Sequence, residues 1–506
     1  MGEEPTTDTE AGAAMEHPLS VDEFFPSPAL QSGTDEESAA VASSFVSPTA
    51  VLPPLPNLAE SDALLLQPSD PRYARFLPAT NKLTQLSPAL RALCNTEHAV
   101  AVMVDWVRSN NLSFAVRCGG HSYEGLSQSS DVVIDVRGLN KIEVDKAAGL
   151  ATVGSGVTLF ALYQALAAQG LALAAGSCPT VGISGHLTGG GHGLLARSHG
   201  LTCDSLRQAT VIDAQARTLV ANADSEPDLY WACRGGGGGS FGIATEFKLN
   251  VFPLRNALVF GVSWKLSQAH AAQLFAMWQS WAPNAPQTIT SIMKVGPGGG
   301  GLISMRCIGQ SVGTETELRS QLRALTQLRT PSSLLTVSSL GFLDAVKHFA
   351  GPLDFEQILM KAKSDYVLTP LTSDGIAAMM VALAPMAPGA IVLLCDSYGG
   401  KIADTASGAT AFPRRAGTQY CIQYFSSWSR AADTSTHLAQ VAKVYAAMRP
   451  HMPGASYVNY CDLDLPDYAA AYWGKNLARL MAVKQQYDPD DIFHHAQSVP
   501  LSVPIS

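Results

Sequence analysis

Short apolar runs separated by polar and glycine-rich turns characterise the chain from about residue 60 to residue 253. Apolar positions at helical spacing predict a helix over residues 96–110, and residues 112–125 predict a buried strand that runs into a glycine turn. The other short segments predict strands at 131–136, 171–175, 209–213, 218–221 and 242–252, a hairpin at 143–153, and helices at 159–168 and 228–233. Before them, residues 53–88 predict loops with one or two short helices.

The pattern changes near Pro253, after which the alternating segments become longer. We expect strands at 258–266, 302–308, 391–396 and 420–425, and helices at 268–281, 315–328, 375–384 and 434–448. These elements predict a second domain, a sheet with helices on one face. Trp473, Leu477, Leu480 and Val483 predict one long helix over residues 469–486.

Charge restricts the class of partner. The 506 residues include 33 basic and 42 acidic ones, giving a formal net charge of −9, and no long Lys/Arg run occurs. We therefore expect no nucleic-acid partner. No apolar run is long enough to span a bilayer, so no membrane partner is expected.

The first 45 residues are acidic, polar and rich in Ala, Ser, Thr and Pro, which predicts a disordered tail without a secretory signal. Nine cysteines are scattered without paired spacing. A reducing, cytoplasmic or otherwise intracellular location fits this pattern best, although a secreted form remains open if the numbering omits a leader.

Three glycine-rich stretches stand in the first half of the chain, at residues 117–125, 170–205 and 228–242. Glycine lets backbone approach a ligand closely and frees N–H groups for phosphate, so the stretches predict a large phosphate-bearing cofactor. Neither a dinucleotide fingerprint nor a P-loop is present. Residues 188–197 begin in glycine and predict a helix whose first amides face a phosphate.

His121 and Cys178 are the first candidates for chemistry. A Cys/His nucleophilic pair is one alternative, disfavoured because Pro179 follows the cysteine and no helix start lowers its pKa. Zinc is another, but His186, His192 and His199 lack compact ligand spacing, so no metal is predicted.

Four motifs in order resemble the berberine bridge enzyme-like branch of the vanillyl-alcohol-oxidase-type flavoproteins. RCGGHSYEG is similar to the family's histidine-attachment loop, and GSCPTVGISGHLTGGGHG to its cysteine-attachment loop. DLYWACRGGGGGSFGI is similar to its FAD-diphosphate region, and YVNYCDLDL with the following YWGKNLARLMAVKQQYDPDDIFHHAQSVP to its C-terminal signature. The resemblance covers about residues 68–500.

The resemblance implies FAD held by two covalent bonds, from His121 to the 8α-methyl and from Cys178 to ring carbon 6. The other implied cofactor-binding residues are Arg117, Gly119, Gly120, Ser122, Val181, Gly182, Gly185, His186, Gly190, Gly191, Gly193, Gly242, Ile243, Tyr457 and Asn459. Two departures are His192, where the family often has an aromatic residue, and the absence of an early cysteine pair, since the first cysteine is Cys94.

The resemblance also implies an α+β fold of two domains. We expect a tail and approach segment at 1–60, and a split FAD-binding domain made of residues 61–253 and the returning segment 457–506. A substrate domain at 254–456 is expected to carry a large antiparallel sheet backed by helices.

Tyr460 matches the family's base position, with Tyr457, Gln423 and Asp396 as further catalytic candidates. A phenol with a pKa near ~10 must be lowered to act near neutrality, which a cation or strong hydrogen-bond donors would do. The alternatives are that the tyrosines are core or rim aromatics and that Asp396 caps the turn before Gly399.

Val181, three residues after Cys178, favours access of dioxygen by the resemblance, so we expect an oxidase that releases hydrogen peroxide. The expected substrate is the reducing-end hydroxyl of an oligosaccharide such as cellobiose or lactose, oxidised to the lactone by a monomeric protein. Aromatic allylic alcohols or secondary metabolites, a dehydrogenase with another acceptor, and a flavin-storage protein without turnover remain alternatives.

Overall fold

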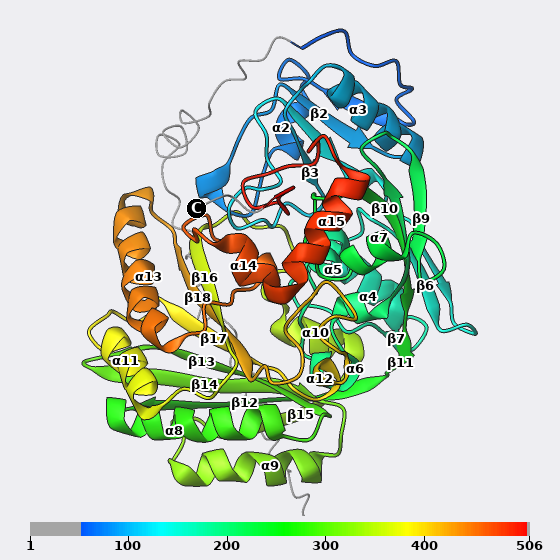
Figure 1. Cartoon of the computed structure of the whole chain (residues 1–506). Coiled ribbons are helices and arrows are strands. Elements are labelled where there is room, and N and C mark those ends of the chain that lie inside the picture. The colour runs from blue at the N-terminus through cyan, green and yellow to red at the C-terminus, as the bar shows by residue number, and fades with distance from the viewer. Residues whose placement is uncertain (1–51, 503–506) are drawn as a thin grey trace, which may run out of the picture.

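The computed structural model describes residues 52–502 of the chain, and the predicted tail over the first 45 residues lies outside them. The described strands form a four-stranded, a five-stranded, a two-stranded and a seven-stranded sheet. Figure 1 shows the two larger sheets in opposite halves of the molecule, with the C-terminal helices α14 and α15 beside the half built from the N-terminal part of the chain.

The four-stranded sheet has the order β1–β2–β4–β3. Its strands are β1 (Ala63–Leu66), β2 (Leu90–Cys94), β4 (Val132–Asp135) and β3 (Phe114–Arg117), and all but β1 are parallel. Helix α3 (Glu97–Ser109) buries its apolar face against this sheet, and the Thr96 side chain caps its first turn by accepting from the Ala99 N–H. Strand β1 lies where the sequence predicts only loops and short helices.

The five-stranded antiparallel sheet lies next along the chain. Its order is β5 (Ile142–Asp145), β6 (Leu150–Gly154), β10 (Ile243–Asn250), β8 (Leu206–Ile212) and β9 (Thr218–Asn222). Along this part of the chain lie α4 (Leu159–Ala167), α5 (Ile183–Thr188), α7 (Pro227–Ala232) and the pair β7 (Leu171–Ala172) with β11 (Phe252–Pro253). The strand predicted over 171–175 is therefore only two residues long. Helix α2 (Tyr73–Phe76) lies beside the four-stranded sheet, and α6 (Ala196–His199) packs on α12 (Lys401–Asp404) and β13 (Ile289–Gly299).

The seven-stranded sheet confirms the expected large antiparallel sheet. Its order is β15 (Thr336–Gly341), β12 (Asn256–Leu266), β14 (Leu302–Ser311), β13 (Ile289–Gly299), β17 (Val392–Ser397), β18 (Tyr420–Trp428) and β16 (Leu359–Val367). Helices α8 (Gln268–Trp281), α9 (Glu315–Leu328), α11 (Ser373–Leu383) and α13 (Thr434–Met448) pack on one face, around buried Trp264 and Trp278. Asp396 lies opposite Ile292, and Gln423 opposite Leu394, on the other face.

Two helical predictions are wrong. The predicted C-terminal helix is broken into α14 (Tyr468–Trp473) and α15 (Leu477–Tyr487), because Gly474 takes a left-handed conformation with φ +49°. The helix predicted over 188–197 does not form: α5 ends at Thr188, and Gly190 and Gly191 take φ values of +117° and +80°. The glycine stretch is a loop, and α6 resumes only at Ala196.

The remaining helices are short connections. They are α10 (Phe342–Ala350), α12 (Lys401–Asp404) and the 3-10 turns Lys82–Thr84, Val136–Gly138, Thr202–Ser205, Ala282–Asn284, Ala431–Asp433, Arg449–His451, Val458–Tyr460 and Gly474–Asn476. Within residues 52–502 the longest apolar helices all fall short of the length needed to cross a membrane.

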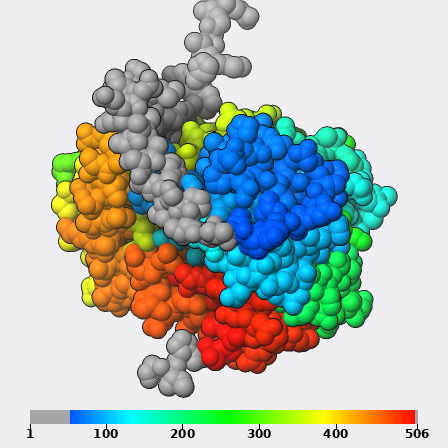
Figure 2. Space-filling model, turned by 90° about the horizontal axis from the view of Figure 1, so that it is seen from above, coloured from blue at the N-terminus to red at the C-terminus, as the bar shows by residue number. Residues whose placement is uncertain are grey.

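The C-terminal segment returns to the N-terminal half. Trp473 and Leu480 share a core with Leu229, and the Phe493 ring meets the Phe114 ring edge-to-face at 5.6 Å. In Figure 2 the red C-terminal residues border residues coloured cyan from the N-terminal half. The domain boundaries at residues 61, 254 and 457 remain predictions from the sequence.

Candidate active site

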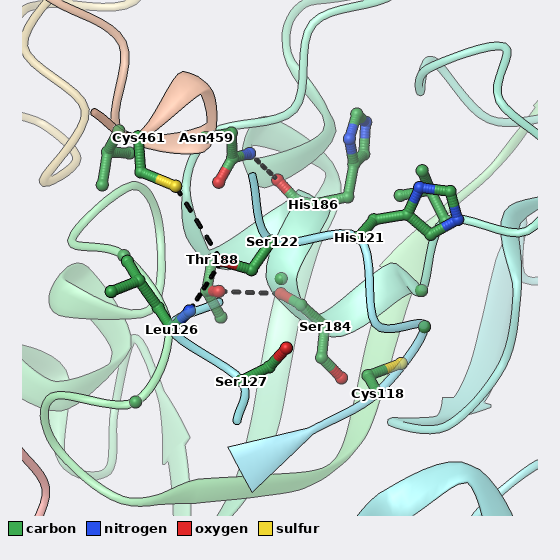
Figure 3. Close-up of a pocket in the computed structure, with 18 of the residues that line it drawn as sticks. Cys118, His121, Ser122, Leu126, Ser127, Ser184, His186, Thr188, Asn459 and Cys461 are labelled. Carbon is green, nitrogen blue, oxygen red and sulfur yellow. Dashed lines mark hydrogen bonds between the residues drawn. The ribbon is translucent and has the colours of Figure 1, made fainter. Parts of the chain in front are cut away.

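A cavity of about 490 Å³ lies between the two halves of the molecule. Its wall comes from residues 114–127, 176–194, 229–244 and 457–461, and the seven-stranded sheet adds Ile292, Leu394, Asp396 and Gln423. Figure 3 shows part of this wall, where loops from distant parts of the sequence face one another. The glycine-rich stretches singled out by sequence therefore meet at one place.

The His121 loop leaves the end of β3 through Gly119 and Gly120. Gly119 packs so closely on Thr180 and Gly182 that a Cβ there would lie 2.7 Å from the Thr180 carbonyl oxygen and 2.5 Å from the Gly182 nitrogen. His121 Nε2 lies 2.8 Å from Thr180 Oγ1. Burial, reinforced by the charge of Arg117, lowers the pKa of His121 to about 4, so its imidazole is neutral near pH 7.

Cys178 lies in the loop after β7. Its side chain is exposed because it faces the cavity, which protein encloses. Burial raises the pKa of its thiol, and the charge of Lys294 on β13 opposes that rise. The loop is held by Tyr163, whose hydroxyl donates to the Gly176 carbonyl oxygen at 2.7 Å. Because Thr180 contacts His121, the two predicted attachment loops touch each other.

Helix α5 presents His186 and Gly185 to the cavity. His186 Nε2 accepts from the Gly176 N–H at 3.0 Å, and its carbonyl oxygen accepts from Asn459 Nδ2 at 3.0 Å (Figure 3). Burial lowers the pKa of His186 to about 4. Gly185 is exposed, and a Cβ built there would meet nothing within 4 Å. A side chain at this glycine would occupy cavity space instead of contacting protein.

The other predicted cofactor-binding residues divide into two groups. Ser122, Val181, Gly182, Gly193, Gly242, Ile243, Tyr457 and Asn459 line the cavity. Arg117, Gly190 and Gly191 lie behind the wall: the Arg117 guanidinium donates to the Pro78 carbonyl oxygen, and the Gly191 N–H donates to Tyr457 Oη at 3.0 Å. These three shape the loops and do not line the cavity.

Asp396 and Tyr460 form a hydrogen-bonded pair where the seven-stranded sheet meets the C-terminal segment. Tyr460 Oη donates to Asp396 Oδ2 at 3.4 Å, so Asp396 contacts the tyrosine and does not cap the turn at Gly399. Burial raises the pKa of Asp396 to about 7, against the lowering effects of Tyr460 and Lys294. Burial and the nearby Asp396 charge also raise the pKa of Tyr460 well above its usual value. Tyr460 therefore does not meet the condition, a lowered phenol pKa, that a tyrosine needs to act by itself as a base near neutrality.

Tyr123 is a site residue that sequence reasoning missed. Its ring stacks on that of Tyr460, with centroids 5.8 Å apart and planes 3° from parallel. Gln423 Nε2 donates to Tyr123 Oη at 2.8 Å, which places the predicted Gln423 in the same cluster. The available signal was an aromatic residue two positions after His121 in a glycine loop. Tyr457, by contrast, accepts from Gly191 and Asn459 and meets Tyr460 edge-to-face at 4.9 Å.

The three histidines considered for zinc do not converge. His199 stacks on Phe252 at 3.6 Å, away from the cavity, whereas His192 stacks on Tyr398 at 5.1 Å in the cavity wall. Among the described residues no cluster of three His, Cys, Asp or Glu side chains could hold a metal ion.

The cavity fits a large cofactor with a flat ring and a diphosphate. Glycine backbone forms much of its wall, including Gly237, Gly238 and Gly239 from the five-glycine run. Ser127 Oγ in the wall is buried without a hydrogen-bond partner among the described residues, which a polar ligand atom would supply (Figure 3). A neutral imidazole and an accessible thiol stand in the same wall.

Comparison with known proteins gives the same picture. Residues 88–222 match the family model described as an FAD binding domain, and residues 456–500 match the one described as berberine and berberine like. The chain is 32% identical to berberine bridge enzyme-like 4 of Arabidopsis thaliana over 478 residues, covering 85% of this chain and 86% of that protein. It is 30% identical to reticuline oxidase of Eschscholzia californica over 478 residues, covering 85% and 88%.

Solved structures add the fold. Physcomitrella patens BBE-like 1 superposes with a TM-score of 0.81 at 30% identity, covering 88% of this chain and 98% of that one. The two halves and the glycine-walled cavity thus define an FAD-linked oxidoreductase of two-domain architecture. Within that class the chain belongs to the berberine bridge enzyme-like family of the vanillyl-alcohol-oxidase superfamily, with FAD as its cofactor.

Proposed function

We propose that this protein is an oxidase that removes a hydride from the carbon bearing a sugar hydroxyl, with dioxygen as the final electron acceptor. The substrate is the reducing end of an oligosaccharide such as cellobiose or lactose, and the product is the lactone. The observation that carries the proposal is the Tyr460–Asp396 pair, which stands in the cavity wall and offers a path for the hydroxyl proton.

FAD bound in this cavity would supply the acceptor for the hydride and the route of both electrons to dioxygen. His121 and Cys178 would hold it covalently. His121 uses Nε2 toward Thr180, which leaves Nδ1 for a bond to the cofactor. In the neutral ring, Nδ1 has a free lone pair in the tautomer whose Nε2–H donates to Thr180 Oγ1. The Cys178 thiol faces the same cavity.

Asp396 and Tyr460 together act as the base. The substrate hydroxyl gives its proton to Tyr460 Oη while Tyr460 gives its own proton to Asp396 Oδ2. Asp396 is the final acceptor, because its pKa of about 7 lies near working pH whereas that of Tyr460 is far higher. Tyr123 stacks on Tyr460 and is held by Gln423, so these two side chains orient the relay.

Val181 supports dioxygen as the acceptor, because its short side chain lines the cavity beside the Cys178 loop. Oxidation of an aromatic alcohol is the second candidate. The parallel rings of Tyr123 and Tyr460 favour it, since such a wall packs on an aromatic substrate as well as on a sugar face.

The test is a panel of oligosaccharides and aromatic allylic alcohols, with peroxide release as the readout. Turnover of a reducing sugar is expected, and no turnover of any sugar would retire the sugar proposal. Anaerobic addition of substrate distinguishes an enzyme from a flavin-storage protein, because only an enzyme bleaches its yellow colour.

A further inference from the structure

A cluster of buried charges lies just outside the cavity and joins three segments. Lys361 on β16 places Nζ 2.6 Å from Glu124 Oε1 and 3.0 Å from Asp462 Oδ1. Lys363, two residues further along the strand, lies 2.8 Å from Asp462 Oδ2 and 2.7 Å from Asp464 Oδ2. We call the trio Glu124, Lys361 and Asp462 the loop tie.

The loop tie is shielded from water. The side chains of Lys361 and Glu124 are each 11% exposed, and that of Asp462 is 4% exposed. The charges of Glu124 and Asp462 raise the pKa of Lys361 despite its burial, so the lysine stays protonated. Charges held this far from solvent are costly to leave unpaired, which makes the geometry of the trio well determined.

Each carboxylate of the loop tie neighbours one ring of the stacked tyrosine pair. Glu124 directly follows Tyr123, and Asp462 is two residues after Tyr460. One ammonium group therefore binds both loops that carry the parallel rings. These loops also meet at the Cys461 thiol, which contacts the Tyr123 and Glu124 backbone and lies 3.9 Å from Ser122 Oγ, but these contacts to sulfur are weak hydrogen bonds (Figure 3).

Lys363 shares two of the carboxylates with Lys361, which also lies 3.2 Å from Asp464 Oδ2. Lys363 contacts only Asp462 and Asp464, both on the Tyr460 side, and lies over the Tyr445 ring at 5.1 Å. It is buried on the same strand with a similar number of ion pairs, yet none of them reaches the Tyr123 loop. The chain thus supplies its own matched control.

We propose that Lys361 is a positioning residue for the proton relay, acting through the loop tie to fix the Tyr123 and Tyr460 loops against each other. The inference rests on the proposed function, in which Tyr460 passes the substrate proton to Asp396. A relay tolerates little displacement, since a 1 Å error in a catalytic group costs about 100-fold in rate. Removal of Lys361 breaks the ion-pair link between the two loops and leaves Glu124 unpaired, while Asp462 keeps Lys363.

The experiment compares flavin reduction in anaerobic single turnovers of the FAD-loaded protein. Lys361→Met is expected to slow reduction roughly 10- to 100-fold. Lys361→Arg is expected to restore most of the rate, because a guanidinium can bind both carboxylates. Lys363→Met is expected to lower thermal stability as much as Lys361→Met does while changing the rate about twofold or less. Glu124→Gln, which keeps the side-chain size, provides a second variant if Lys361→Met does not fold.

A double-mutant comparison separates positioning from general loosening. In a Tyr460→Phe background the relay is already lost, so Lys361→Met should slow reduction no further. Equal effects of Lys361→Met and Lys363→Met, or undiminished slowing in the Tyr460→Phe background, would overturn the inference. If Tyr460→Phe slows flavin reduction and Lys361→Met does not, this inference alone is overturned. If Tyr460→Phe reduces its flavin at the normal rate, the proposed function is overturned as well.

Discussion

The burial of Asp396 sets the pKa that its proposed catalytic role requires. Asp396 is enclosed on the inner face of β17, where it accepts from Tyr460 and feels the charge of Lys294. Burial removes the water that would stabilise its charge, and the resulting pKa of about 7 suits a group that must take up a proton near neutrality.

The pH profile of flavin reduction tests that role. Asp396 accepts a proton only when ionised, so the rate should rise with pH through about 7 and then level off. Asp396→Asn should lower the plateau by about 100-fold and abolish the rise. Anaerobic stopped-flow measurements from pH 5 to pH 9 would show both effects.

Neighbouring groups provide the internal control for that profile. Burial gives His121, His186 and His192 pKa values of about 4, so they stay neutral throughout. Burial lowers the pKa of Lys294 to about 8, and because the Asp396 charge opposes that lowering, any inflection from Lys294 should move to lower pH in Asp396→Asn. A variant that keeps both the rise near pH 7 and the full plateau rate would remove Asp396 from the relay.

The same carboxyl makes stability depend on pH. Its pKa is about 3.8 unfolded and about 7 folded, so folding binds a proton between these values and stability falls as pH rises through 7. Asp396→Asn removes the buried charge and should stabilise the protein at pH 8 but not at pH 4, by at most ~4 kcal/mol. Urea unfolding of both proteins at the two pH values measures the difference, and an equal difference at both would contradict the assignment.

At the scale of elements, periodicity predicts helices better than strands. Helices α8, α9 and α13 begin and end where the sequence predicts, because each has a regular apolar face. Strands β13, β15 and β16 were not predicted. In β16, Lys361 and Lys363 interrupt the apolar pattern, and the carboxylates that allow their burial lie on distant segments. The hydrophobic pattern around a lysine does not show which distant carboxylates pair with it.

The glycine loop after α5 shows a second limit of the sequence. Apolar residues near 194 suggest helix, but the positive φ angles of Gly190 and Gly191 end it. Gly191 is also crowded: a Cβ there would lie 2.4 Å from Thr202 Oγ1 and 2.8 Å from His186 Nε2. Residue identity alone shows neither the angle nor the crowding.

Gly191→Ala should therefore destabilise the protein by ~1–3 kcal/mol and displace His186 from the cavity wall, so that less FAD is incorporated when the protein is made. Gly389→Ala is the control, since Gly389 has a similar φ of +81° but nothing within 4 Å of its Cβ position. It should cost about 1 kcal/mol and leave FAD content unchanged. FAD absorbance after gel filtration measures FAD content, and thermal unfolding measures stability. Equally low FAD content in the two variants would assign the effect to backbone strain.

At the scale of the molecule, the sequence predicted residues of the cavity wall better than the side chains that surround the Tyr460–Asp396 pair. His121, Cys178 and Tyr460 come from motifs that resemble a family, and all three line one cavity. Tyr123 and Lys361 belong to the site through contacts with Tyr460, Gln423 and Asp462, which lie a hundred or more residues away in the sequence. Such contacts exist only once the two halves are assembled.

The assembled cavity wall brings together the two residues proposed to bind FAD covalently. His121 and Cys178 lie on loops that touch through Thr180, so one ring can reach both. Acid-unfolded protein should weigh one FAD more than its polypeptide and stay yellow. His121→Ala and Cys178→Ala should each keep the added mass through the remaining bond, and the double variant should lose it. Cys118→Ala, at another thiol of the same wall, should change nothing. Retention of FAD by the double variant would show that a different side chain holds the cofactor, and its loss from one single variant would show that only one bond forms.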